Sequence, residues 1–229
     1  MATTPAPRWQ RLDHDERRRQ ILACARRLFS ERHYAAVSTS EIAREAGVAR
    51  GLLHHYFRTK RELYLEVVRA LVRVPSHPVP EADDGRTVEE QIEDSVGRWL
   101  ETLRRNRGTW LAANGAQGLG RDPEVEAILE QAREHAIDSL IVAIRPGDPA
   151  TAPPELRAVL RAYSGFAEAA SLEWLERRRL TREQAHALVV QGFFSIVRDA
   201  LPAVERLAPQ PGRASNGNRK INHVRKAVQ

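Results

Sequence analysis

STSEIAREAGVARGLLHHYFRTK, residues 38–60, predicts two short helices joined by a glycine turn. Ser38, followed three residues later by Glu41, is typical of a capping box at the start of a helix. Gly47 supplies the backbone conformation that ends a helix, and Leu53 and Phe57 then place two apolar side chains on one helical face. This pattern predicts a helix-turn-helix, whose second helix enters the major groove of DNA.

Amphipathic helices are predicted on both sides of this motif. Apolar positions at Ile21, Ala25 and Phe29 follow the helical period within residues 13–32, and Thr59 with Glu62 is typical of the start of a further helix. We therefore predict a three-helix DNA-binding domain over residues 13–60. Residues 1–12 are predicted to form a flexible arm.

Three segments in this region carry a family resemblance: TSEIAREAGV, then ARGLLHHYF, then RTKRELY. Together with the preceding apolar helix they resemble the TetR family of transcriptional regulators. The similarity extends over residues 15–72, and beyond Leu71 only the helical layout is similar. The resemblance implies an all-α fold, in which the DNA-binding domain is followed by a helical ligand-binding and dimerisation domain.

The resemblance implies DNA contacts for eight residues. Those implied to contact backbone phosphates are Thr39, Ser40, His54, Tyr56 and Lys60. Arg50 and Leu52 would face base edges, and Gly51 would let the helix approach DNA closely. The sequence departs from the family pattern at Leu52, where a small or hydroxyl residue is usual, and at His54, where tyrosine is usual.

Elementary chemistry supports part of this assignment without the family. An arginine near the start of a recognition helix can bridge two guanine acceptors, as Arg50 would, and a leucine such as Leu52 can contact a thymine methyl group. The alternative for Arg50 is an ordinary solvated side chain, and His54 is equally open. His55 lies about 100° around the helix from His54, so we expect no metal at this pair and expect His55 to pack against the core.

Composition limits the classes of protein that this chain can be. With 229 residues and 42% hydrophobic side chains, it can bury a core without disulfides, and its single cysteine, Cys24, is expected to be a buried thiol. The formal net charge of +6 is uneven, with +6 on residues 1–60, −5 on residues 61–210 and +5 on residues 211–229. Attraction for a polyanion is therefore predicted at the two ends of the chain.

Several functional classes find no support in the sequence. No run approaches 18 consecutive apolar residues and the first ten residues lack the apolar core of a signal peptide, so we expect a cytoplasmic protein outside the membrane. No catalytic constellation is evident, because carboxylate pairs such as Glu89 and Glu90 lie where solvation explains them. We expect neither an enzyme nor a cofactor.

The remainder of the chain, residues 61–208, is predicted to be a helical body. Proline-rich breaks at residues 75–87 and 146–154 interrupt it, and a glycine-rich connection is expected at residues 109–120. Helix starts are predicted at Thr87 with Glu90, at Asp122 before Pro123, and at Thr181 with Gln184. The basic segment 209–229 is predicted to be disordered.

The last two long helices are candidates for a subunit interface. The family resemblance implies that residues 155–178 and 182–201 form a four-helix bundle with their copies in a homodimer. Physics agrees, because a symmetric dimer reads two half-sites about 34 Å apart.

Aromatic and polar residues in the later helices suggest a ligand pocket with an apolar wall. The candidate lining residues are Trp99, Trp110, Asn114, Tyr163, Phe166, Glu168 and Trp174. Ordinary core packing is the alternative for each of them, because helical bundles use the same residue types. The resemblance implies a small-molecule effector with an apolar part, whose identity the sequence leaves open.

The leading hypothesis is a dimeric regulator, more often a repressor in this family, that binds a palindromic double-stranded DNA operator and is released by a small molecule. The alternative is an all-helical small-molecule-binding protein or enzyme without specific DNA recognition. A third hypothesis, a non-specific nucleic-acid packaging protein, is disfavoured by the acidic body.

Overall fold

The computed structural model describes residues 14–73, 85–115 and 122–207. These residues form helices and no strand, which confirms the all-α prediction, while the predicted arm 1–12 and tail 209–229 lie outside them. The α-helices are α1 His14–Glu31, α2 Thr39–Glu45, α3 Arg50–Tyr56, α4 Lys60–Val72, α5 Val88–Arg105, α6 Arg107–Ala113, α7 Pro123–Ile144, α8 Pro154–Leu175, α9 Arg182–Ser195 and α10 Leu201–Leu207.

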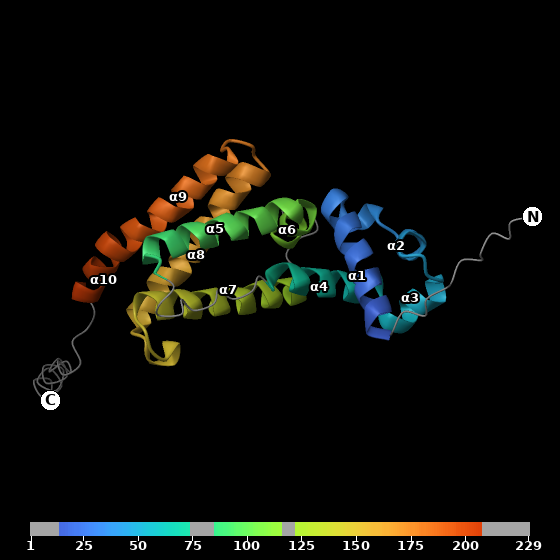
Figure 1. The fold of residues 1–229 in the computed structure, drawn as a ribbon, viewed down its shortest axis with the longest axis horizontal. Coiled ribbons are helices and arrows are strands. Elements are labelled where there is room, and N and C mark those ends of the chain that lie inside the picture. The colour runs from blue at the N-terminus through green and yellow to red at the C-terminus, as the bar shows by residue number, and fades with distance from the viewer. Residues whose placement is uncertain (1–13, 74–84, 116–121, 208–229) are drawn as a thin grey trace, which may run out of the picture.

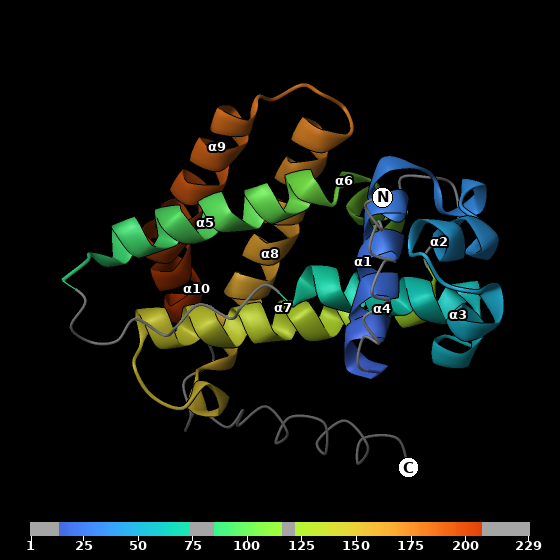
Figure 2. The same cartoon turned by 45° about the vertical axis from the view of Figure 1, so that its right-hand side comes forward.

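The two ends of the molecule are built from different parts of the chain. Helices α1 to α3 lie together at one end, whereas α9 and α10 lie at the opposite end (Figure 1). Helix α4 leaves the first group and runs beside α7, with α5 and α8 completing the body (Figures 1 and 2). The helix-turn-helix is therefore far from the last two long helices.

The predicted helix starts are correct because each depends on local chemistry. The side chains of Ser38, Thr59, Thr87 and Thr181 each accept a hydrogen bond from the backbone N–H three residues later. Thr87 and Thr181 form complete capping boxes, but Glu41 does not reach back to Ser38 and pairs with Arg32 instead. Such caps satisfy N–H groups that the helix leaves without partners.

Helix α6 replaces the first part of the glycine-rich connection predicted at residues 109–120. Its residues are almost all buried, and Trp110 Nε1 donates to Ser171 Oγ at 3.0 Å. Gly108 lies so close to α1 that a Cβ there would stand 2.4 Å from the carbonyl oxygen of Ser30. Packing against distant segments stabilises this short helix, which its local sequence did not predict.

Two clusters of buried apolar side chains hold the helices together. The first joins α1 to α4 with Trp110 of α6 and Ile128 of α7, so the DNA-binding region shares its core with the body. The second lies among α5, α7, α8 and α9, and Trp99 and Trp174 pack against both clusters. The predicted domain boundary at residue 60 falls at the first residue of α4, the helix that belongs to both regions.

The C-terminal helices form one continuous run. Five residues in π-helical conformation, Ile196–Ala200, connect α9 to α10. The run Arg182–Leu207 is long enough to cross a membrane, and its most apolar 18-residue window has a mean hydropathy of 1.4, but core helices of soluble proteins share both properties. Only 22% of its most apolar window is buried, so much of this surface is open in the single subunit.

Candidate functional site

The turn between α2 and α3 is fixed by backbone geometry. Gly47 adopts a φ of +61°, a left-handed conformation that glycine tolerates best, and Val48 N donates to the carbonyl of Ala43 at 2.9 Å. Ile42 and Ala43 are buried below the turn. The angle between the two helices therefore follows from one glycine and a small apolar contact.

Helix α3 is anchored by one face and exposed on the other. Leu53 and Phe57 are completely buried, and the guanidinium of Arg18 lies 5.1 Å from the centre of the Phe57 ring. Arg50 and Gly51 are exposed, and Leu52 is an unusually exposed leucine at 37%. The Arg50 side chain forms no hydrogen bond or ion pair with any residue that the structure describes. The exposed face of α3 is thus available to another molecule.

The predicted phosphate-binding residues lie on α2, on α3 and at the start of α4. Thr39 and Ser40 occupy the first turn of α2, where Thr39 is half-buried and Ser40 is exposed. The ring centre of Tyr56 lies 4.6 Å from that of His14. His54 Nδ1 lies 3.3 Å from the carbonyl oxygen of Arg58. Each of these four side chains is therefore at least partly open to solvent.

Lys60 is less free than the sequence suggested. Its Nζ donates to the carbonyl oxygen of Tyr34 and lies 4.1 Å from the centre of the Tyr34 ring. Partial burial lowers the pKa of Lys60. The ammonium group therefore stabilises the segment after α1. A phosphate contact would be a second role for the same group.

The prediction that His55 packs against the core is wrong. His55 is exposed, and its ring lies 6.4 Å from the ring of His14 and 5.6 Å from that of Tyr56. Leu53 and Phe57 define the buried side of α3, and a residue midway between them along a helix points away from that side. Cys24 is half-buried against the core, where burial raises the pKa of its thiol.

The body contains a cavity of about 1000 Å³ among α4, α5, α7 and α8. Of the candidate pocket residues, Trp99, Trp110, Tyr163 and Glu168 line it. Asn114, Phe166 and Trp174 do not. Asn114 Nδ2 donates to the carbonyl of Trp110, and the Phe166 ring instead lies against Gly192 of α9.

An ion pair crosses one wall of the cavity. Arg133 Nη2 donates to both carboxylate oxygens of Glu168, at 2.9 and 3.1 Å, and Arg133 also pairs with Glu130. Burial opposes the charge of Arg133, which is 17% exposed, but these bonds outweigh it and raise its pKa. Sequence analysis did not identify Arg133, because 35 residues separate it from Glu168 and no local pattern pairs them.

A second group that sequence analysis missed joins the DNA-binding region to the body. Arg61, in the first turn of α4, donates to both oxygens of Asp122 and to Glu124 at 2.7 Å. Asp122 caps α7 by accepting from the backbone N–H groups of Glu124 and Val125. The start of α4 is therefore tied to the start of α7.

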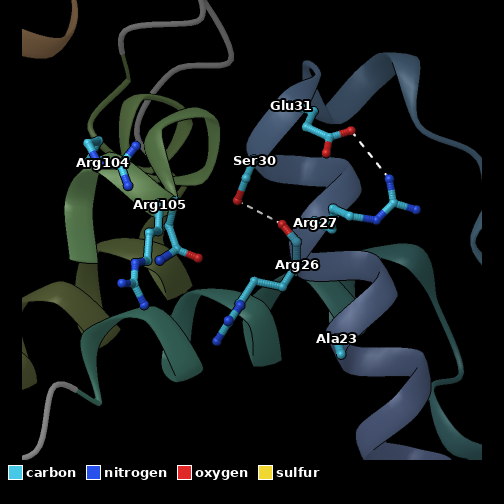
Figure 3. Close-up of a pocket in the computed structure, with 8 residues that line it drawn as sticks. Ala23, Arg26, Arg27, Ser30, Glu31, Arg104 and Arg105 are labelled. Atoms are coloured by element: carbon cyan, nitrogen blue, oxygen red, sulfur yellow. Dashed lines mark hydrogen bonds and ion pairs between the residues drawn. The ribbon is translucent and has the colours of Figure 1, made fainter. Parts of the chain in front are cut away.

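A smaller cleft of about 380 Å³ separates α1 from the junction of α5 and α6. Arg26 and Arg105 extend from its two walls in the same direction, while Ser30 donates to the carbonyl of Arg26 (Figure 3). Arg104 and Arg105 both bond Glu101 and lower the pKa of that carboxyl to about 2. Carboxylates outside the cleft thus balance much of its charge, and we assign it to the junction between the two regions.

Family models match both regions of the chain. Residues 21–67 match "Bacterial regulatory proteins, tetR family", and residues 88–196 match "Tetracyclin repressor-like, C-terminal domain". The HTH-type transcriptional activator FasR of Mycolicibacterium smegmatis is 45% identical over 62 residues, which are 27% of this chain and 28% of FasR. The similarity to this relative therefore covers little more than the helix-turn-helix region.

Solved structures extend the likeness to the whole fold. A tetR-family transcriptional regulator from Streptomyces coelicolor has a TM-score of 0.69 at 24% identity, covering 88% of this chain and 94% of that one. A transcriptional regulator from Saccharomonospora viridis, solved in complex with choline, has a TM-score of 0.60 at 22% identity and covers 81% and 98%. With a helix-turn-helix at one end and a matching helical body, this chain belongs to the TetR family of DNA-binding transcriptional regulators, a family of transcription factors and not of enzymes.

Proposed function

We propose that this chain is a cytoplasmic repressor that binds a palindromic DNA operator as a homodimer and is released by a small molecule. The observation that carries the proposal is the exposed face of α3, where Arg50 has no partner among the described residues. Neither the solvated Arg50 nor the exposed Leu52 has an evident use within the subunit. Both side chains suit base edges in a major groove.

DNA contacts would divide between reading and positioning. Arg50 and Leu52 would contact base edges, and Gly51 would allow close approach. The side chains proposed to hold phosphates are Thr39, Ser40, His54, Tyr56 and Lys60. Phosphate contacts fix the position of a protein on DNA, whereas base contacts give specificity.

The exposed surface of α8 and α9 supports a homodimer. Small residues occupy one exposed face of α8, and exposed Ala187 and Leu188 lie on α9. The α8 residues are Ala158, Ala162, Gly165 and Ala169. Small side chains let helices approach closely, so these faces fit a bundle with a second copy.

The cavity supports a small-molecule effector. Its walls include Trp99, Trp110, Tyr163 and Glu168, with the other candidates Asn114, Phe166 and Trp174 outside the lining. Choline in the Saccharomonospora viridis structure supports a small ligand for this fold. Leu71 and Val72, at the end of α4, line the same cavity, so a ligand there contacts the helix that follows α3.

The mechanism requires a difference in affinity between two states of the dimer. A ligand lowers DNA affinity only if it binds better to the state in which the two α3 helices do not fit the operator. A coupling of about 1–3 kcal/mol changes the affinity roughly 5- to 150-fold.

Selection of bound sequences from random duplex DNA tests the proposal. We expect a palindromic consensus from a protein that sediments as a dimer, and enrichment of no sequence would contradict specific recognition. In vitro transcription decides the direction of regulation, because FasR is named as an activator.

Two variants separate reading from positioning. Arg50→Ala is expected to cost roughly 1–3 kcal/mol of operator binding and to relax one base position, whereas Lys60→Ala should weaken binding to all sequences alike and reduce the salt dependence. Because Lys60 also bonds Tyr34, thermal unfolding of Lys60→Ala must be measured beside its DNA affinity. Identical behaviour of the two variants across salt concentrations would contradict these roles.

A further inference from the structure

The side chains that line the large cavity carry an excess of positive charge. Among the residues that the structure describes, they include five arginines and one carboxylate, that of Glu168. The arginines are Arg69, Arg73, Arg86, Arg98 and Arg133. Asp94, which lies outside the lining, pairs with Arg86 and Arg98 and offsets part of their charge. The remaining excess of positive charge favours anionic ligands.

The one carboxylate is already engaged. Glu168 receives three hydrogen bonds from Arg133, so this pair contributes little net charge to the wall. A cationic ligand that bound Glu168 would have to displace Arg133 and leave a half-buried guanidinium with fewer partners, which is costly. Glu168 therefore offers no free negative charge to a cation.

The arginines at the end of α4 are less completely neutralised. Arg69 bonds Glu66 at 2.9 Å, but Glu66 also bonds Arg18 at 2.9 Å. Burial opposes ionisation of Glu66, and the two guanidinium groups outweigh it and lower its pKa. Arg73, one turn beyond Arg69, has no side-chain partner among the described residues. Glu66 thus divides its charge between Arg18 and Arg69, which leaves net positive charge at the end of α4, where Arg69 and Arg73 line the cavity.

The polar groups of the inner wall are mostly satisfied by the protein itself. Trp110 Nε1 donates to Ser171, and the Tyr163 hydroxyl donates to the carbonyl of Val189 at 3.2 Å. Each lining serine donates its hydroxyl to the carbonyl four residues earlier in its own helix. These serines are Ser95, Ser139 and Ser164.

The inner wall therefore presents apolar surface despite its polar residue names. Trp99 and Trp110 meet edge to face at 6.3 Å, next to Val96, Leu103 and Ile128. Transfer of an apolar group from water to such a wall lowers the free energy of binding. The cavity thus combines an apolar interior with a basic edge.

We propose that the effector is an amphipathic anion, with an apolar chain between α5 and α7 and an acid group at Arg69 and Arg73. This inference rests on the proposed function, which places an effector in the cavity. Guanidinium groups bind carboxylates and phosphates through short, charge-assisted hydrogen bonds. The acid group would bind beside the last turn of α4, the helix that follows the recognition helix.

Four ten-carbon probes that differ only in the head group test the proposal: decanoate, decyl phosphate, decanol and decyltrimethylammonium. Calorimetric titration of the full chain, below the concentrations at which the probes aggregate, should show both acids binding about tenfold or more tightly than the other two. Added salt should weaken binding of the acids but not of decanol. Tightest binding of decyltrimethylammonium, or equal binding of all four, overturns the proposal.

Matched variants locate the acid group. The double variant Arg69→Gln/Arg73→Gln should lower decanoate affinity about tenfold and leave decanol affinity unchanged, whereas Arg69→Lys/Arg73→Lys should retain most of the preference. Arg179→Gln/Arg206→Gln is the control, because both residues are exposed and outside the cavity lining. Equal losses in the control and test variants contradict the assignment.

The failure of this inference is distinguishable from failure of the proposed function. If no probe binds while random-sequence selection still yields a palindrome, the anionic effector is wrong and the DNA-binding regulator stands. If selection yields no consensus, the proposed function fails whichever probes bind.

Discussion

The DNA-binding helices and the body differ in how closely their apolar side chains pack. Around α1 to α3 the large apolar residues Phe29, Ile42, Leu53 and Phe57 are each at most 2% exposed, and they fill a small core completely. In the body, by contrast, apolar side chains from α5, α7 and α8 surround a cavity of about 1000 Å³. A close-packed core transmits displacement as a rigid unit, whereas a cavity lets its walls rearrange around a ligand.

The largest expected effect comes from emptying the filled core. Phe57→Ala should lower the free energy of unfolding by about 3–5 kcal/mol, because it creates a cavity in a core that cannot collapse. Leu140→Ala, at a half-buried residue that faces the existing cavity, should cost less than about 2 kcal/mol. Urea unfolding followed by circular dichroism measures both, and equal costs would remove the contrast.

The next effect concerns the contact between the two regions. In Gly108→Ala the new methyl group would stand 2.4 Å from the carbonyl oxygen of Ser30 and 2.6 Å from that of Phe29, so α6 and α1 must separate. We expect a loss of about 1–3 kcal/mol in thermal unfolding. Gly97→Ala is the control, because its methyl group would meet only His186 at an ordinary 3.8 Å. A Gly108 variant as stable as the control would show that this contact gives way easily.

Substitution of Gly51 should have a smaller effect, and it should raise stability instead of lowering it. A Cβ at Gly51 would meet nothing within 4 Å, and no positive φ requires glycine there. Gly51→Ala should therefore stabilise the fold by up to about 1 kcal/mol, because alanine favours helix. It should still weaken operator binding, if DNA is what approaches this residue. Fluorescence anisotropy with labelled operator, beside thermal unfolding, tests both, and unchanged affinity would count against close approach.

The smallest stability effect is expected at the tie between α4 and α7. Arg61 and Asp122 are 47% and 36% exposed, so Arg61→Gln should cost no more than about 1 kcal/mol. The Arg61–Asp122 ion pair lies between the cavity and α3. In Arg61→Gln, effector-dependent release of DNA should therefore change more than the free energy of unfolding does. Release measured as the ratio of operator affinities with and without ligand provides the test, with Arg206→Gln as the control. A ratio equal to that of the control would exclude Arg61 from coupling.

The same variant has a consequence for pH dependence. Burial opposes ionisation of Asp122, but the backbone N–H groups at α7 and the Arg61 guanidinium outweigh it and lower its pKa. A lowered pKa in the folded state stabilises the protein above the unfolded value, about 3.9, and this stabilisation is lost as pH falls. Arg61→Gln should therefore lose less stability than the parent chain below about pH 4. An identical acid response would contradict this origin.

The sequence predicted the helix-turn-helix well because its determinants are local. The cap at Ser38, the left-handed Gly47 and the buried pair Leu53 and Phe57 all act within one or two turns of the chain. His55 was misjudged because a seven-residue helix buries only a narrow face. Where a single turn of chain sets the structure, pattern is sufficient.

The body was harder to predict because its determinants are distant in sequence. Helix α6 depends on contacts such as that of Trp110 with Ser171, and the cavity wall depends on Arg133 and Glu168 meeting across two helices. Periodicity identified aromatic side chains facing inward. It did not distinguish the lining residue Trp99 from Trp174, because both have a helical pattern of apolar neighbours.

The length of α4 has a mechanical consequence. Its thirteen residues, Lys60–Val72, make a rod about 20 Å long. Pivoted at the cavity end, a tilt of only about 5° sweeps the opposite tip through roughly 2 Å, comparable to the reach of a hydrogen bond. A modest push beside Val72 is thus magnified at Lys60, where the chain has just left the helix that carries Arg50.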